Sequence, residues 1–343
     1  MIDFRYHLVS IIAVFLALAV GIALGGALLH GALPTTQNDS GERGAETERL
    51  RAEKDVAERL SSGGDRLVDA YADRILRDRL DGVGVAVVEA PGADPRLREG
   101  IAERIRQAGG TVTARPALTD TYLDPGEAAF VRELTDQLAT GIGLPRGSAH
   151  DRAGTLLGRA LLRSDGKDSD DGDSGFDSAA ALAGFAEAGM LGLDGEPGDA
   201  AGAADAVVVL APAEPLAADA EAYAAVQRSG GEEPTGSRIM LDTANALEGV
   251  SEAAVLVGGP SAARPGGLVH QARAEGAAYS TVDAAGSDAG DVAAALVVAA
   301  AAEGGEGAYG VAEGTDAFMP APLPGAEDGA DGADDTADDD EAK

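Results

Sequence analysis

A long apolar stretch lies near the start of the chain. Residues 8–29, LVSIIAVFLALAVGIALGGALL, contain no charged side chain, and about 20 helical residues cross the hydrocarbon core of a membrane. The apolar region of a cleaved signal peptide is shorter, roughly 7–15 residues, and a small-residue cleavage site follows it. The pattern predicts an uncleaved signal anchor, a transmembrane helix, with cleavage as the alternative.

Charges on the two sides of this stretch predict its orientation. Arg5 precedes it, and Asp39 and Glu42 follow it before any Arg or Lys. Positively charged flanks stay in the cytoplasm. We therefore expect a single-pass protein of the cell membrane, with residues 1–7 as a cytoplasmic head and the bulk of the chain outside.

Small residues recur every four positions within the predicted helix, at Ala13, Ala17, Gly21 and Gly25. Such ridges let two helices approach closely in lipid. The chain is rich in Ala and Gly throughout, so compositional chance is the alternative. We predict a helix-association ridge that supports a homo-oligomer.

Polar and helical patterns follow the apolar stretch. Residues 30–44 combine Pro, Gly, Ser and Asn and predict a linker. Residues 45–80 carry many charges among good helix formers, with apolar side chains near heptad spacing at Leu50, Ala57, Leu60, Leu67 and Tyr71. We predict a short coiled coil, interrupted at SSGG, and keep a solvated amphipathic helix as the alternative.

From residue 82 to residue 311, apolar runs of strand length alternate with helical patterns. Strands that are apolar on both faces and alternate with helices predict a doubly wound, mainly parallel sheet, an extracytoplasmic α/β domain. Residues 164–175 read as an acidic loop, and residues 312–343 as a disordered acidic tail. The strands are predicted at 82–92, 111–118, 205–214, 237–243, 252–260 and 278–285. The helices are predicted at 94–110, 126–140, 151–164, 218–231, 266–276 and 289–304.

Composition narrows the function classes. The 343 residues carry a formal net charge of −33 and only 3% aromatic residues. Nucleic acid and anionic lipid both need basic patches, so electrostatic binding to either is not expected. The chain has no Cys, which excludes disulfides, thiolate ligands and a nucleophilic Cys.

Metal ligands are few and scattered. The His residues are His7, His30, His150 and His270, and the Met residues are Met1, Met190, Met240 and Met319. No two of them have the i, i+3 or i, i+4 spacing of a helical site, and copper prefers thiolate, thioether and imidazole ligands. We predict no tightly bound cofactor.

Catalytic motifs are also missing. Neither a Walker A sequence nor G-x-S-x-G occurs, and G-x-G-x-x-G does not follow the first strand. Residues 258–267, GGPSAARPGG, are interpreted as a plain loop, with anion binding as the alternative. Asp242 and Asp283 each follow a predicted strand and are interpreted as helix caps, with a ligand crevice as the alternative. We predict that the protein is not an enzyme.

The beginning of the chain, MIDFRYHLVSIIAVFLALAVGIALGGALL, resembles that of the actinobacterial copper transport protein B (MctB-like) family. The stretch YSTVDAAGSDAGDVAAALVVAAAAEGGEGAYG resembles the closing segment of the same family. The resemblance implies a cell-envelope protein of copper export, pore-forming in an outer envelope, or one that works with a partner in cell separation. It implies no metal site on named residues.

Two functions follow from these observations. The first is a membrane-anchored envelope protein of copper transport or homeostasis, with copper as the transported ion and an oligomeric pore as its form. The alternative is a non-enzymatic coiled-coil scaffold that binds an envelope protein in cell-wall remodelling or cell separation. A single span makes no pore unless it oligomerises, so the residues favour the scaffold and the resemblance favours copper.

Overall fold

The computed structural model describes residues 37–163, 175–214, 216 and 235–325. The predicted transmembrane helix, its small-residue ridge, the acidic loop up to residue 174 and the helix predicted at 218–231 all lie outside these ranges. Within them, no helix is long and apolar enough to span a membrane. The chain divides into two compact units, Met1–Gly63 and Gly64–Lys343.

The described part of the first unit belongs to a single helix. Helix α2 runs from Gln37 to Leu76 without a break, so it begins inside the predicted linker and passes through SSGG. The described part of the predicted linker, residues 37–44, is therefore helical, and SSGG does not interrupt the helix, because the segment as a whole is rich in Glu, Arg and Ala, which favour helix. Residues 30–36 of the predicted linker lie outside the described ranges. Whether α2 pairs into a coiled coil stays a prediction.

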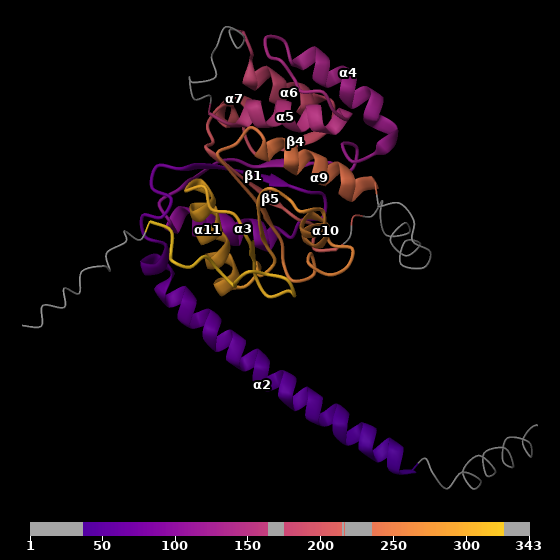
Figure 1. Ribbon diagram of the computed structural model, residues 1–343, viewed down its shortest axis with the longest axis vertical. Helices are drawn as coiled ribbons and strands as arrows, with labels where there is room; N and C mark the ends of the chain where they lie inside the picture. The colour runs from indigo at the N-terminus through magenta and orange to yellow at the C-terminus, as the bar shows by residue number, and fades with distance from the viewer. Residues whose placement is uncertain (1–36, 164–174, 215, 217–234, 326–343) are drawn as a thin grey trace, which may run out of the picture. The chain divides into compact units, whose positions relative to one another are not determined.

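The second unit contains an eight-stranded sheet with helices on both faces (Figure 1). The strands run in the order β4-β3-β1-β5-β6-β7-β8, and β2 pairs with β1 beside β3. All neighbours are parallel except β3 and β4. The predicted mainly parallel α/β domain is confirmed. The strands are β1 Gly84–Glu89, β2 Thr111–Ala114, β3 Pro116–Leu118, β4 Leu191–Leu193, β5 Ala206–Leu210, β6 Ala253–Val257, β7 Ser280–Val282 and β8 Ala308–Tyr309.

Nine further helices in the described ranges follow or connect these strands. They are α3 Pro95–Gln107, the 3-10 helix η1 Pro125–Glu127, α4 Ala128–Leu138, α5 Ala149–Leu161, α6 Ser178–Glu187, α7 Pro197–Ala200, α9 Thr235–Glu248, α10 Leu268–Glu275 and α11 Asp288–Ala302. Local sequence explains several starts: Asp94 caps α3 ahead of Pro95, and Ser148 and Asp151 form a capping box on α5.

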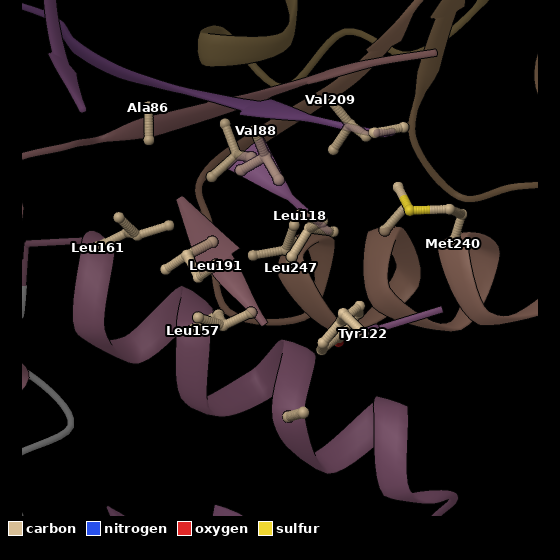
Figure 2. Close-up of a cluster of buried hydrophobic side chains, with 14 of the residues drawn as sticks. Ala86, Val88, Leu118, Tyr122, Leu157, Leu161, Leu191, Val209, Met240 and Leu247 are labelled. Atoms are coloured by element: carbon tan, nitrogen blue, oxygen red, sulfur yellow. The ribbon is translucent and has the colours of Figure 1, made fainter. Parts of the chain in front are cut away.

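The central strands separate two hydrophobic clusters because their side chains alternate between faces. Every residue of β1, β5 and β6 is buried. One cluster joins the sheet to α4, α5, α6, α9 and α10, and Figure 2 shows part of it around Val88, Leu118 and Tyr122. The other joins the opposite face to α3, α11 and the last turns of α2.

Helix α9 replaces the strand predicted at 237–243. Met240, Ala244 and Leu247 fall on one helical face and are buried against the first cluster. Helix α5 lies very close, since a Cβ at Gly154 would stand 2.8 Å from the Ala246 side chain. Tertiary packing on α5 therefore overrides the strand-like run Ile-Met-Leu.

The end of the domain also differs from the prediction. Residues 312–325, expected to be disordered, are described: Tyr309 forms a bridge with Ala317, and Leu323 packs on the second cluster. The buried Asp283 carboxylate, which accepts the Val311 and Ala312 N–H groups, holds the start of this segment. Residues 326–343 lie outside the described part.

Candidate functional site

The carboxyl edge of the parallel sheet is the natural place to look for a ligand. The order of strands reverses at β1, which has β2 and β3 on one side and β5 on the other. Ligands of doubly wound sheets bind at this switch point. Here the loop after β1 contacts the loop after β5. The Ala213 N–H donates to the Gly92 carbonyl at 3.3 Å, and Pro212 lies beside Gly92.

Glu89, the last residue of β1, lies at this switch point. Its side chain is 10% exposed and receives the Arg98 guanidinium of α3, with Nη1 3.3 Å from Oε2. Burial raises the pKa of Glu89, and Arg98 offsets part of that rise. The pair neutralises itself, so it stabilises the edge of the sheet and offers no free charge to a ligand.

Asp283 follows β7, as predicted, but it serves the chain itself. Its carboxylate is fully buried, lies 2.5 Å from Arg273 and accepts the Val311 N–H at 2.6 Å. The Ala312 N–H donates to the same carboxylate at 3.3 Å. Asp283 is therefore neither a helix cap nor an open ligand position. It anchors the segment that follows β8.

Asp242 lies within α9 instead of at a strand end, which overturns the predicted crevice it would share with Asp283. The Ser148 hydroxyl donates to it at 3.2 Å, and Arg238 lies 3.5 Å away. Burial raises the pKa of Asp242, and the negative charge of Asp151 raises it further. Asp242 joins α9 to the start of α5.

His150 belongs to a buried network on the same side of the sheet. Its Nε2 lies 3.0 Å from the Tyr122 carbonyl, and its ring meets the Tyr122 ring edge-on at 5.1 Å. The Tyr122 hydroxyl in turn contacts the Thr243 hydroxyl at 2.9 Å. Burial lowers the pKa of His150. The network ties three segments together, and His150 is not presented to solvent as a metal ligand.

The other candidate copper ligands are also separated by their surroundings. Met190 and Met240 are fully buried in the first hydrophobic cluster, Met319 is 40% exposed, and His270 is exposed on α10. Among the described residues, no group of three His, Asp or Glu side chains is arranged to hold a metal ion. His7, His30 and Met1 lie outside the described ranges.

The glycine-rich loop at 258–267 follows β6 and precedes α10, as predicted. The Ala262 carbonyl accepts the His270 N–H at 3.1 Å, so the loop itself satisfies a backbone donor in the first turn of the helix. A Cβ at Gly267 would lie 2.1 Å from that carbonyl oxygen, which explains the glycine there. The arrangement favours the plain loop over an anion site.

Sequence reasoning missed the arginines that organise these clusters. Arg98, Arg104 and Arg273 all lie within amphipathic helices, and Arg104 is 5% exposed. The available signal was position: Arg104 falls seven residues after Leu97 and three after Ile101, on the apolar face of α3. A charged residue at such a position implies a buried partner.

Comparison with known proteins adds information that the geometry lacks. The family model described as copper transport outer membrane protein, MctB, matches residues 1–320. The copper transporters MctB of Mycobacterium tuberculosis and Mycobacterium bovis are each 32% identical over 171 residues, covering 47% of this chain and 53% of the relative. That of Mycobacterium leprae is 31% identical over 172 residues. The chain spans about half the length of the curated relatives it matches.

Proposed function

Because the chain belongs to the MctB family of copper transport outer membrane proteins, we propose that it acts in copper transport or copper homeostasis at the cell envelope. The family match over residues 1–320 is the observation that carries this proposal. The relatives named copper transporters support it over the half of the chain they cover.

The proposed role assigns no buried copper site to the described residues. Soft ligands bind Cu(I) best, and Met190 and Met240 are enclosed in an apolar cluster. Copper movement then depends on assembly, either as an oligomeric pore or together with a partner protein. The proposed topology is a single-pass anchor with a cytoplasmic amino terminus.

A strain that lacks the gene for this chain tests the copper role. We expect it to tolerate less copper than its parent, to accumulate more cell-associated copper, and to recover when the full chain is restored. Tolerance of zinc and cobalt, measured in parallel, controls for a leaky envelope. Unchanged copper tolerance and content would contradict the proposal.

Self-association is proposed through the small-residue ridge and α2. Replacing Gly21 and Gly25 by Ile puts bulky side chains on the ridge and should weaken association in a membrane reporter assay. Gly26→Ile, one position off the ridge, is the matched control. Equal association of all variants would mean that the ridge reflects composition.

A second candidate function is a scaffold that binds another envelope protein, and α2 supplies the observation that favours it. Five large apolar side chains on this helix are at least 49% exposed, at Leu50, Val56, Leu60, Leu67 and Tyr71. Exposed apolar side chains that recur along a helix at near-heptad spacing are typical of helix-pairing surfaces. Chained or misdivided cells with normal copper tolerance in the deletion strain would favour this function.

A further inference from the structure

The middle of helix α2 contains the residues least suited to a helix. Ser61, Ser62, Gly63 and Gly64 lie side by side, 24 residues after its start at Gln37 and 12 before its end at Leu76. Each glycine in a helix interior costs about 1 kcal/mol relative to alanine, and serine adds a smaller cost. Within residues 46–76 of α2, this stretch therefore has the lowest helix propensity.

Packing does not explain the two glycines. A Cβ built at Gly63 or at Gly64 meets nothing within 4 Å, and both residues are exposed. Neither has the positive φ that favours glycine elsewhere in the chain. Alanine would fit at both positions and would strengthen the helix, so their visible effect is to weaken it.

The helix becomes anchored immediately after these glycines. The Asp65 carboxylate accepts the Ala289 N–H at 3.4 Å, and Asp69 pairs with the buried Arg104 at 2.9 Å. Ala72 and Leu76 are fully buried in the second cluster. The segment 65–76 is therefore held by charge pairs and by apolar packing.

Residues before the glycines differ in burial from the residues after them. Every residue from 46 to 64 is exposed. Ion pairs run along this part of the helix, such as Arg49 with Glu53 at 2.8 Å. The boundary between the two compact units falls between Gly63 and Gly64.

From this coincidence we propose that Ser61–Gly64 is a hinge, a site at which residues 46–60 move as one helical rod while residues 65–76 stay fixed to the α/β domain. The ion pairs between residues four apart keep the rod helical. Arg104, shared by Asp69 and Asp288, stops the bend from continuing into the anchored turns. The hinge is independent of the copper role.

Distance measurements on the full chain in detergent test the hinge. The chain has no cysteine, so spin labels attach only where cysteine is introduced. One pair joins Arg51→Cys on the rod to Glu103→Cys on α3. The control pair joins Arg66→Cys, after the glycines, to Glu103→Cys. Excess unlabelled chain suppresses distances between copies.

We expect a broad distance distribution for the first pair and a narrow one for the control pair. In the Gly63→Ala/Gly64→Ala background the first distribution should narrow to the width of the control, because alanine restores helix propensity. The variant Ala52→Gly/Ala57→Gly weakens the helix before the hinge. In this variant the distance distribution of the control pair should stay narrow and that of the first pair should stay broad.

Two results would overturn the proposal. A first distribution as narrow as the control in the natural sequence would show that α2 is rigid through the glycines. A broad distribution that persists in the double alanine variant would place the bending elsewhere in α2. Circular dichroism of each variant verifies that its helix content is retained.

Discussion

Arg104 connects three helices through one side chain. It projects from the apolar face of α3, and its Nη2 lies 2.9 Å from a carboxylate oxygen of Asp69 on α2 and 2.9 Å from one of Asp288 on α11. The arginine side chain is 6% exposed, whereas the two carboxylates are 58% and 45% exposed. Water can therefore solvate the two carboxylates if the arginine is lost. The buried arginine charge, in contrast, is compensated by these carboxylates and not by water.

Arg104→Ala should lower the free energy of unfolding by about 1–2 kcal/mol, because it removes a shared ion pair and buried packing while its partners can be rehydrated. Arg106→Ala is the matched control on the same helix. Arg106 is half exposed and pairs only along α3 with Glu103, so its loss should cost about 0.5 kcal/mol or less. Chemical denaturation measures both, and equal costs would contradict the central position given to Arg104.

Asp291 gives the domain a specific pH dependence. Its carboxylate is buried between α11 and α3 and accepts the Gly286 N–H at 2.8 Å. Its pKa is raised from 3.8 to about 6, chiefly by burial. The Gly286 N–H and Arg104 oppose this rise, and the negative charges of Asp288 and Asp65 add to it. Between these two pKa values the folded chain binds more protons than the unfolded chain, so this group stabilises the fold as the pH falls.

The effect of Asp291 is isolated by comparison with Asp291→Asn, which keeps an acceptor for Gly286 but does not titrate. Between pH 7 and pH 5 the natural chain should gain about 1 kcal/mol of unfolding free energy relative to the variant. Denaturation curves at both pH values measure this difference, in which the other carboxylates cancel. A difference that stays constant, or that reverses in sign, would exclude the raised pKa.

At the scale of elements, the sequence predicts best where pattern and packing agree. The runs GVAVVE, AVVVL and AAVLV are apolar throughout, and each is a strand buried on both faces. It predicts badly where distant contacts decide the outcome. The run around Met240 has the pattern of a strand. It is helical in the structure because it packs on α5 at Gly154, about 85 residues earlier in the chain.

The segment after β8 is the clearest case of order that composition conceals. The end of the chain, GAEDGADGADDTADDDEAK, is acidic and poor in apolar residues, which predicts disorder. The predicted disordered tail extends back over residues 312–325, which include Phe318, Met319 and Leu323. Backbone donors at Val311 and Ala312 bind Asp283, while Arg79 donates to the Pro324 carbonyl. These contacts join positions far apart in sequence, which a local pattern cannot reveal.

Gly310 should be essential to this segment. Its φ is +132°, and a Cβ would lie 2.2 Å from an Asp283 carboxylate oxygen. Gly310→Ala should lower the free energy of unfolding by about 2–4 kcal/mol, from backbone strain and from displacement of the carboxylate. Gly314 also has a positive φ, +86°, but open space around it, so Gly314→Ala should cost about 1 kcal/mol from strain alone. Thermal unfolding compares the two, and equal losses would remove Asp283 from the explanation.

At the scale of the whole molecule, the candidate site was the hardest feature to predict. The sequence placed Asp283 correctly after a strand but could not reveal that Arg273 and two backbone N–H groups occupy its carboxylate. It also could not foresee that His150 turns toward the Tyr122 carbonyl. Such partners come from elements that are distant in sequence, so they cannot be predicted from hydrophobic periodicity.

Copper affinity is where the family and the described residues give different expectations. A tight Cu(I) site gathers soft ligands about 2–2.5 Å from one ion, and the chain has no thiolate to contribute. Met190 and Met240 would have to leave the apolar cluster in which they are fully buried. His150 would have to give up the Tyr122 carbonyl. Carboxylates are abundant, but they suit hard cations and bind copper weakly.

We therefore expect residues 45–325 to bind copper no more tightly than about micromolar, which corresponds to roughly 8 kcal/mol of binding free energy. Competition against a chelator of known affinity measures this under reducing and oxidising conditions. The triple variant His150→Gln/Met190→Leu/Met240→Leu should bind copper as weakly as the natural sequence, and Met319→Leu controls for the exposed thioether. A stoichiometric sub-nanomolar site that disappears in the triple variant would show that the core opens to admit copper. Weak binding in every variant would leave assembly of several chains, or a partner, as the means by which this protein handles the metal.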